Sequence, residues 1–127
     1  AEVGTSGAND SIATVNIAGA TVYGNVYGGC NTSRVYGQTT VNIGDDVITN
    51  DNLTKGNVLI NGTVFGGGEA NASGSEEYDY SYISVTNAIV ININGNDYTN
   101  FDILGSIFGS GNASTSGGTS EITIKNY

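Results

Sequence analysis

The sequence has no histidine, proline, methionine or tryptophan, and its 127 residues include one cysteine, Cys30. Without histidine, neither a Ser-His or Cys-His nucleophile system nor a histidine-based zinc site can form. One cysteine excludes an intramolecular disulfide and a cysteine-based metal cluster. No apolar run reaches the roughly 18 residues that a membrane-spanning helix needs. We therefore expect no insertion into a membrane.

Cations are also scarce, since three lysines and arginines face twelve acidic residues, for a net charge of −9. Nucleic acid is an unsuitable partner for such a chain, because its binding depends on cations that neutralise phosphates. The polar residues are instead glycine (20 residues), asparagine, serine and threonine. This composition is typical of many short strands joined by tight turns, because glycine and asparagine tolerate positive φ and β-branched residues suit pleated surfaces.

Two internal repeats organise the chain. An eleven-residue block occurs three times without gaps, at 20–30, 58–68 and 101–111. Its pattern is apolar, any, β-branched, any, Gly, any, Val or Ile, aromatic, Gly, small, small. A shorter pattern of apolar, polar and apolar residues has the period of a half-buried strand. It recurs at 15–17, 41–43, 91–93 and 122–124.

Repeats of this kind cannot bury their apolar faces alone, so they must stack. The sequence predicts a single all-β domain over 1–127, a short parallel β-solenoid of about three to four turns with inserted loops. Its repeat blocks lie near 13–43, 58–93 and 101–126. A β-sandwich is the alternative, but it leaves the eleven-residue block unexplained. Stacking in register predicts three ladders: Val22, Ile60 and Ile103; Val26, Val64 and Ile107; and Ile17, Ile43, Ile93 and Ile124.

The glycines at the fifth position of the block, Gly24, Gly62 and Gly105, are predicted to face inward at corners. There a side chain would not fit, or φ would be positive. Neither end of the chain resembles a capping repeat. We therefore expect a segment of a longer array, or a unit that stacks end to end with other copies.

The segments 24–31 and 62–69 resemble the Gly-x-Val-aromatic-Gly-Gly-Gly repeats of large surface proteins from anaerobic, often gut-dwelling, bacteria. In those proteins the repeats alternate with Thr-x-Val-x-Ile strands, like 39–43 here. The resemblance implies a right-handed β-helix at the extracellular bacterial cell surface, with an adhesin-like or stalk-like role. The implied partners are a host glycan or protein, or other copies of the chain. Cys30 and Ser110 depart from the pattern, so no residue role is carried over.

The aromatic position of the block supplies the first candidate binding residues, Tyr27, Phe65 and Phe108. If the strand alternation continues through them, they point outward and form a surface for sugar rings or a partner chain. The chain would then be a carbohydrate-binding module. Alternatively, the following glycine bends the chain and the aromatics form a core ladder, which is the arrangement we expect.

Two loops hold the other candidates. Tyr78, Tyr80 and Tyr82 alternate with acidic or small residues, and tyrosine-rich surfaces are common at interfaces. Asp45, Asp46 and Asp51 are calcium candidates by residue type, but their spacing matches no calcium motif, so we expect a solvated acidic loop and no cofactor. Paired carboxylates could in principle hydrolyse a glycoside. Adjacent acids in loops are usually only solvated, and we expect no enzymatic activity.

Overall fold

The computed structural model describes residues 3–4, 10–30, 35–44, 57–69, 83–85, 87–96, 98–111 and 115–127. These residues form short strands and no helix. The strands are β1 (Ser11–Ile17), β2 (Ala20–Val22), β3 (Val26–Tyr27), β4 (Gly37–Gly44), β5 (Val58–Ile60), β6 (Val64–Phe65), β7 (Ile83–Val85), β8 (Ile89–Asn94), β9 (Phe101–Ile103), β10 (Ile107–Phe108), β11 (Thr115–Ser116) and β12 (Ser120–Lys125).

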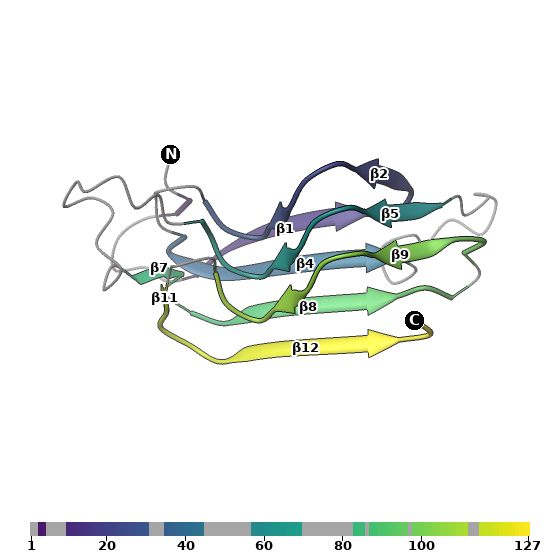
Figure 1. The fold of residues 1–127 in the computed structure, drawn as a ribbon. Coiled ribbons are helices and arrows are strands. Elements are labelled where there is room, and N and C mark those ends of the chain that lie inside the picture. The colour runs from purple at the N-terminus through teal and green to yellow at the C-terminus, as the bar shows by residue number, and fades with distance from the viewer. Residues whose placement is uncertain are drawn as a thin grey trace.

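All pairings between these strands are parallel. The long strands form one sheet in the order β1-β4-β8-β12, and the short ones form β2-β5-β9, β3-β6-β10 and β7-β11. The chain runs along a long strand, turns, and returns through two or three short strands before the next long strand begins one level further along the stack (Figure 1). We call each such circuit a rung. The protein is a parallel β-solenoid, as predicted, and the β-sandwich alternative is wrong because no hairpin pairing joins these strands.

The register of the rungs follows the predicted ladders. Val22 pairs with Ile60 and Ile60 with Ile103, while Val26 pairs with Val64 and Val64 with Ile107. On the long-strand sheet, the ladder is Ile17, Ile43, Ile93 and Ile124. The eleven-residue block is therefore two short strands separated by a bend.

The main core lies between the long-strand sheet and the opposing short strands. Along β4 and β8, alternate residues are buried and the residues between them are partly exposed. The buried residues meet those of β5, β6 and β9, so the core consists of isoleucine and valine. Its buried members are Val26, Val41, Ile43, Val58, Ile60, Val64, Ile91, Ile93 and Ile103.

A smaller cluster lies at the other end of each rung, where Val35, Val85 and Ile89 are buried. Val35 bridges to both Val3 and Val85, so this corner is also stacked from rung to rung. Cys30 is partly buried against the same cluster. Its position agrees with a packing role for this side chain.

The fifth-position glycines agree with the prediction only in part, because a side chain would not fit at Gly62 or Gly105. None has a positive φ, and they do not face the core. A Cβ on Gly62 would lie 2.5 Å from the carbonyl oxygen of Gly24, and one on Gly105 would meet the carbonyl oxygen of Gly62. A Cβ on Gly24 would meet nothing within 4 Å. These glycines therefore let one rung approach the backbone of the rung before it.

The outer face of the long-strand sheet carries a ladder of asparagines. The side-chain amide of Asn42 donates to Oδ1 of Asn16 at 3.0 Å, and that of Asn92 donates to Oδ1 of Asn42 at 2.9 Å. Identical amides stacked at the strand spacing satisfy one another, as in other cross-β ladders. These hydrogen bonds stabilise the register of the rungs on the outer face of the sheet.

Candidate functional site

The three aromatic residues of the repeated block form a continuous ring stack. Tyr27 pairs with Phe65 and Phe65 with Phe108 in the parallel register of β3, β6 and β10. The ring centroids of Tyr27 and Phe65 are 5.0 Å apart with an interplanar angle of 5°. For Phe65 and Phe108 the values are 5.2 Å and 10°. The separation follows the spacing between parallel strands, about 4.8 Å, so the backbone register sets the stack.

These rings lie on the outer side of the short strands. The glycine that follows each ring takes the inward position instead. A Cβ on Gly28 would lie 2.9 Å from Cγ2 of Val41, and one on Gly66 would collide with Ile89. Phe65 is 8% exposed and belongs to neither core cluster. The ladder agrees with the expected core ladder only at its centre, where Phe65 and its neighbours Val64 and Gly66 are buried. The inward positions before and after each ring are taken by valine or isoleucine and by glycine, so the ring between them is directed outward.

The stacking restricts what the ladder can bind. A sugar ring docks against the flat face of an aromatic ring, and both faces of Phe65 are covered by its neighbours. Only the outer faces of the two end rings, Tyr27 and Phe108, remain uncovered by the ladder. Phe108 is 48% exposed. The ladder therefore presents ring edges along its side and a ring face at each end.

The remaining predicted site residues cannot be placed. Tyr78, Tyr80 and Tyr82, and the calcium candidates Asp45, Asp46 and Asp51, all lie outside the described residues. Among the residues that the structure does describe, no three histidine, cysteine or acidic side chains come together in a group able to hold a metal ion. The two loop predictions stay predictions.

Exposed apolar side chains concentrate at the C-terminal end of the stack. Among the described residues, β12 is the last strand of the long-strand sheet, and no short strand lies opposite it. Its inward residues Ile122 and Ile124 are consequently 39% and 50% exposed, whereas Ile91 and Ile93 one rung earlier are 0% and 1% exposed. We call the surface formed by β12, β9 and β10 the open end.

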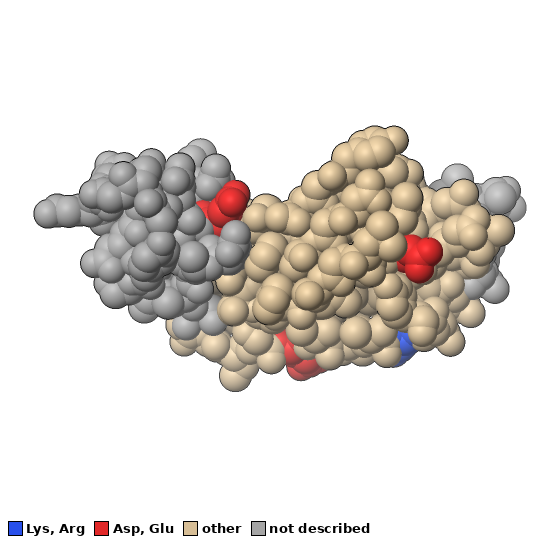
Figure 2. All heavy atoms as spheres, viewed as in Figure 1, with Lys and Arg blue, Asp and Glu red and all other residues tan. Residues whose placement is uncertain are grey.

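Few charges accompany these side chains. The face in Figure 2 is mostly uncharged, with isolated acidic side chains and a basic one near its lower edge. The described part of the chain contains four acidic residues, Asp10, Glu69, Asp102 and Glu121. Two of them, Asp102 in β9 and Glu121 in β12, lie on strands of the open end, together with Lys125 of β12.

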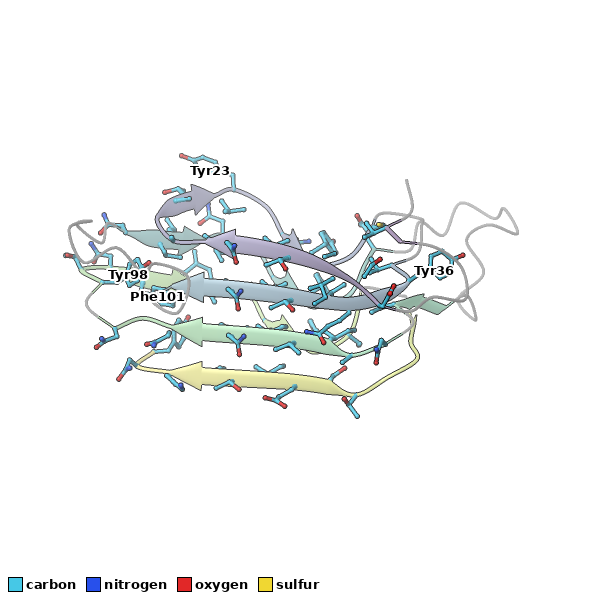
Figure 3. The ribbon with its side chains drawn as sticks, turned by 180° about the vertical axis from the view of Figure 1, so that it is seen from behind. Tyr23, Tyr36, Tyr98 and Phe101 are labelled. Atoms are coloured by element: carbon cyan, nitrogen blue, oxygen red, sulfur yellow. The ribbon has the colours of Figure 1, made fainter. Side chains whose placement is uncertain are left out.

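A second group of aromatics closes the turn after the long strands. Tyr98 packs edge to face on Phe101 at 5.2 Å, and Phe101 does the same with Tyr127 at 5.7 Å. Figure 3 shows Tyr98 and Phe101 side by side at this turn. The Tyr98 hydroxyl donates to the carbonyl oxygen of Ala18 at 2.5 Å, which ties the third rung to the first. Desolvation at this partly buried position raises the pKa of Tyr98 above its ordinary value of 10.0.

The sequence did not predict this group of aromatic residues. Phe101 occupies the first position of the repeated block, but Tyr98 and Tyr127 lie outside both repeats. Their only signal is that aromatic residues are rare in this chain, at 9%. Their meeting depends on the stacking of segments far apart in the sequence.

Comparison of the chain with known protein families, curated proteins and solved structures finds no relative. No protein-family model, curated protein or solved structure matches the chain. Across the described residues, no helix has the length and apolar character needed to cross a bilayer. The class that the fold defines is therefore the parallel β-solenoid, and the functional argument depends on the geometry of this stack.

Proposed function

We propose that this chain is a structural and interaction module, a β-solenoid segment of an extracellular bacterial surface protein that serves as a stalk or an adhesive surface. The observation that carries the proposal is the in-register stacking of the rungs. The strands of each rung pair only with those of the neighbouring rungs, so the solenoid extends along one axis by adding rungs. A structure of this kind suits a spacer that holds other parts of a protein away from a cell. The proposal includes no enzymatic activity.

Location is the first part of the proposal to test. An antibody raised against this chain should label intact cells of its source bacterium, and external protease should remove the signal. Antibody against a cytoplasmic protein is the control and should label only permeabilised cells. Labelling that requires permeabilisation would exclude a surface role.

Self-association is the second part. Stacking β1 of one copy onto β12 of another would cover Ile122 and Ile124 and complete the long-strand sheet. The short-strand sheets would then lack one strand at the junction, because they end one rung earlier than the long-strand sheet. Sedimentation velocity over a range of concentrations, with electron microscopy of the same samples, tests whether copies join despite this vacancy. Rods that lengthen with concentration support a fibre, and a single monomeric species excludes it.

Carbohydrate binding through the aromatic ladder is the alternative function. The covered faces of Phe65 make this function less compatible with the geometry than a role in assembly. A glycan array decides the question. A hit that Tyr27→Ala or Phe108→Ala removes would support sugar docking on an end ring, and a blank array for the folded chain would exclude it.

A further inference from the structure

The tripeptide Ile-Asn-Gly occurs twice in the chain, at 60–62 and at 93–95. An asparagine before a glycine is especially prone to lose its side-chain amide, because glycine has no side chain to obstruct attack by its own backbone nitrogen. No other asparagine of the sequence precedes a glycine. Since the two copies consist of the same residues, a difference in their reactivity must come from the fold.

The second copy is held firmly at the end of β8. Asn94 is 7% exposed and pairs with Lys125 in the long-strand sheet. Its Oδ1 accepts from the backbone N–H of Asn96 and from the side-chain amide of Asn126, both at 3.1 Å. The N–H of Gly95, whose nitrogen would have to attack Asn94, donates to the carbonyl of Lys125 at 3.2 Å. Loss of the Asn94 amide therefore requires these hydrogen bonds to break first.

The first copy lies in the bend that follows β5 (Figure 1). Asn61 is exposed, and within the described part of the chain no hydrogen bond restrains its side-chain amide. Its backbone N–H donates to the carbonyl of Val22 at 2.9 Å, so the main chain stays in the stack while the side chain can rotate. The same position of the block is Tyr23 in the rung before and Leu104 in the rung after. The surroundings of Asn61 are thus those of an internal rung.

We propose that Asn61 is a site of spontaneous deamidation in the folded protein and that Asn94 is protected from the same reaction. The backbone nitrogen of Gly62 attacks Cγ of Asn61 and forms a five-membered succinimide ring. The bond from Cγ to the side-chain nitrogen breaks, and ammonia leaves with the proton of the Gly62 nitrogen. Water then opens the ring at one of its two carbonyls and gives aspartate or isoaspartate. Water is the only co-reactant, and nothing is oxidised or reduced.

The two products differ in their main chain. Aspartate keeps the normal peptide bond and adds one negative charge to an exposed position. Isoaspartate carries the main chain through its side-chain carbon, which makes the link between residues 61 and 62 one carbon longer. The two products should therefore have different effects on the stack.

The bend has no room for a longer main chain. Its three residues join Ile60 to Val64, which are both 0% exposed in the core. A Cβ on Gly62 would lie 2.5 Å from the carbonyl oxygen of Gly24, and the carbonyl of Gly62 accepts from the N–H of Gly105 at 3.0 Å. The extra carbon must displace β6 relative to β5 or break contacts with a neighbouring rung. We expect isoaspartate at position 61 to weaken the stack.

Mass spectrometry of the aged protein tests the choice of site. The full chain is incubated at mildly alkaline pH, both folded and in guanidinium chloride, and is then digested with pepsin in acid, where further deamidation is slow. In the folded chain, Asn61 should convert at least about tenfold faster than Asn94, whose hydrogen bonds must open first. In guanidinium chloride the two should convert at similar rates. Fragmentation should show isoaspartate beside aspartate at position 61, as the succinimide route requires.

Urea unfolding of the aged protein measures the effect on the stack. A second population with a lower midpoint should appear, and its share should follow the isoaspartate content. Asn61→Asp supplies the charge without the longer main chain and should unfold like the wild type. Asn61→Gln is the control for ageing, because its longer side chain closes a six-membered ring slowly. Its midpoint should stay constant during the incubation.

Equal rates at Asn61 and Asn94 in the folded chain would overturn the inference, and so would conversion of Asn61 in the denatured chain alone. Aspartate without isoaspartate would exclude the succinimide route. A single population with the midpoint of fresh protein, despite a measured isoaspartate content, would show that the bend accepts the extra carbon. Surface labelling of cells is independent of all these outcomes, so this inference and the proposed function fail separately.

Discussion

The ladder of Ile17, Ile43, Ile93 and Ile124 allows one substitution to be compared at two levels of the stack. Ile93 is 1% exposed in the third rung, and Ile124 occupies the same ladder one rung later with 50% exposure. Both residues have the same side chain and the same strand environment. The open end is the main difference between them.

Ile→Ala removes three carbons, and each buried methylene or methyl contributes about 0.8 kcal/mol. At Ile93 the transfer term is about 2.4 kcal/mol, and the cavity left between the two sheets brings the expected loss to about 3–4 kcal/mol. At Ile124 half of the side chain already meets water and no closed cavity forms. We expect Ile124→Ala to lower the free energy of unfolding by about 1 kcal/mol.

Urea unfolding of the wild type and both variants, followed by circular dichroism, measures the difference. With an m-value of about 2 kcal/mol/M, the midpoint should fall by about 1.5–2 M for Ile93→Ala and about 0.5 M for Ile124→Ala. The runs should be repeated at a tenfold lower protein concentration. Equal losses at the two positions would refute the reasoning, because they would mean that Ile124 is covered in solution.

Four further variants test the rest of the structure by urea unfolding. Gly66→Ala should destabilise the fold by about 1–3 kcal/mol, because the added Cβ would collide with Ile89. Gly24→Ala should leave the free energy of unfolding unchanged, because the added Cβ would meet open space. Similar losses for the two variants would contradict the inward position of Gly66. Asn42→Ala should cost about 1–2 kcal/mol by removing two ladder hydrogen bonds, and no loss would show that the ladder does not stabilise the stack. The pKa of Tyr98 is raised in the folded chain, so as the pH rises the unfolded chain releases the phenol proton first. The contribution of Tyr98 to the free energy of unfolding should therefore be constant at neutral pH and fall above about pH 10. Tyr98→Phe should show a shallower decline than wild type between pH 9 and 11, and parallel declines would refute the assignment.

Much of the fold was readable because repeats turn a three-dimensional problem into alignment of the chain with itself. Once 20–30, 58–68 and 101–111 are aligned, the stacking of Val22 on Ile60 on Ile103 follows, since parallel strands in register place equivalent residues above one another. The candidate site was less predictable. The sequence placed Tyr27, Phe65 and Phe108 in one column, but the direction of their rings depended on which neighbour meets the opposite sheet.

By itself, the sequence determined the repeat, the parallel stack and the apolar ladders, because these depend on local alternation and on self-similarity. Only the tertiary structure decided that glycine, and not the aromatic ring, occupies the inward position after Val26, Val64 and Ile107. It alone brought Tyr98, Phe101 and Tyr127 together and placed a hydroxyl on the edge of β9. The reason is physical: such contacts join residues up to 80 positions apart, and their geometry depends on how many rungs lie on each side of the core.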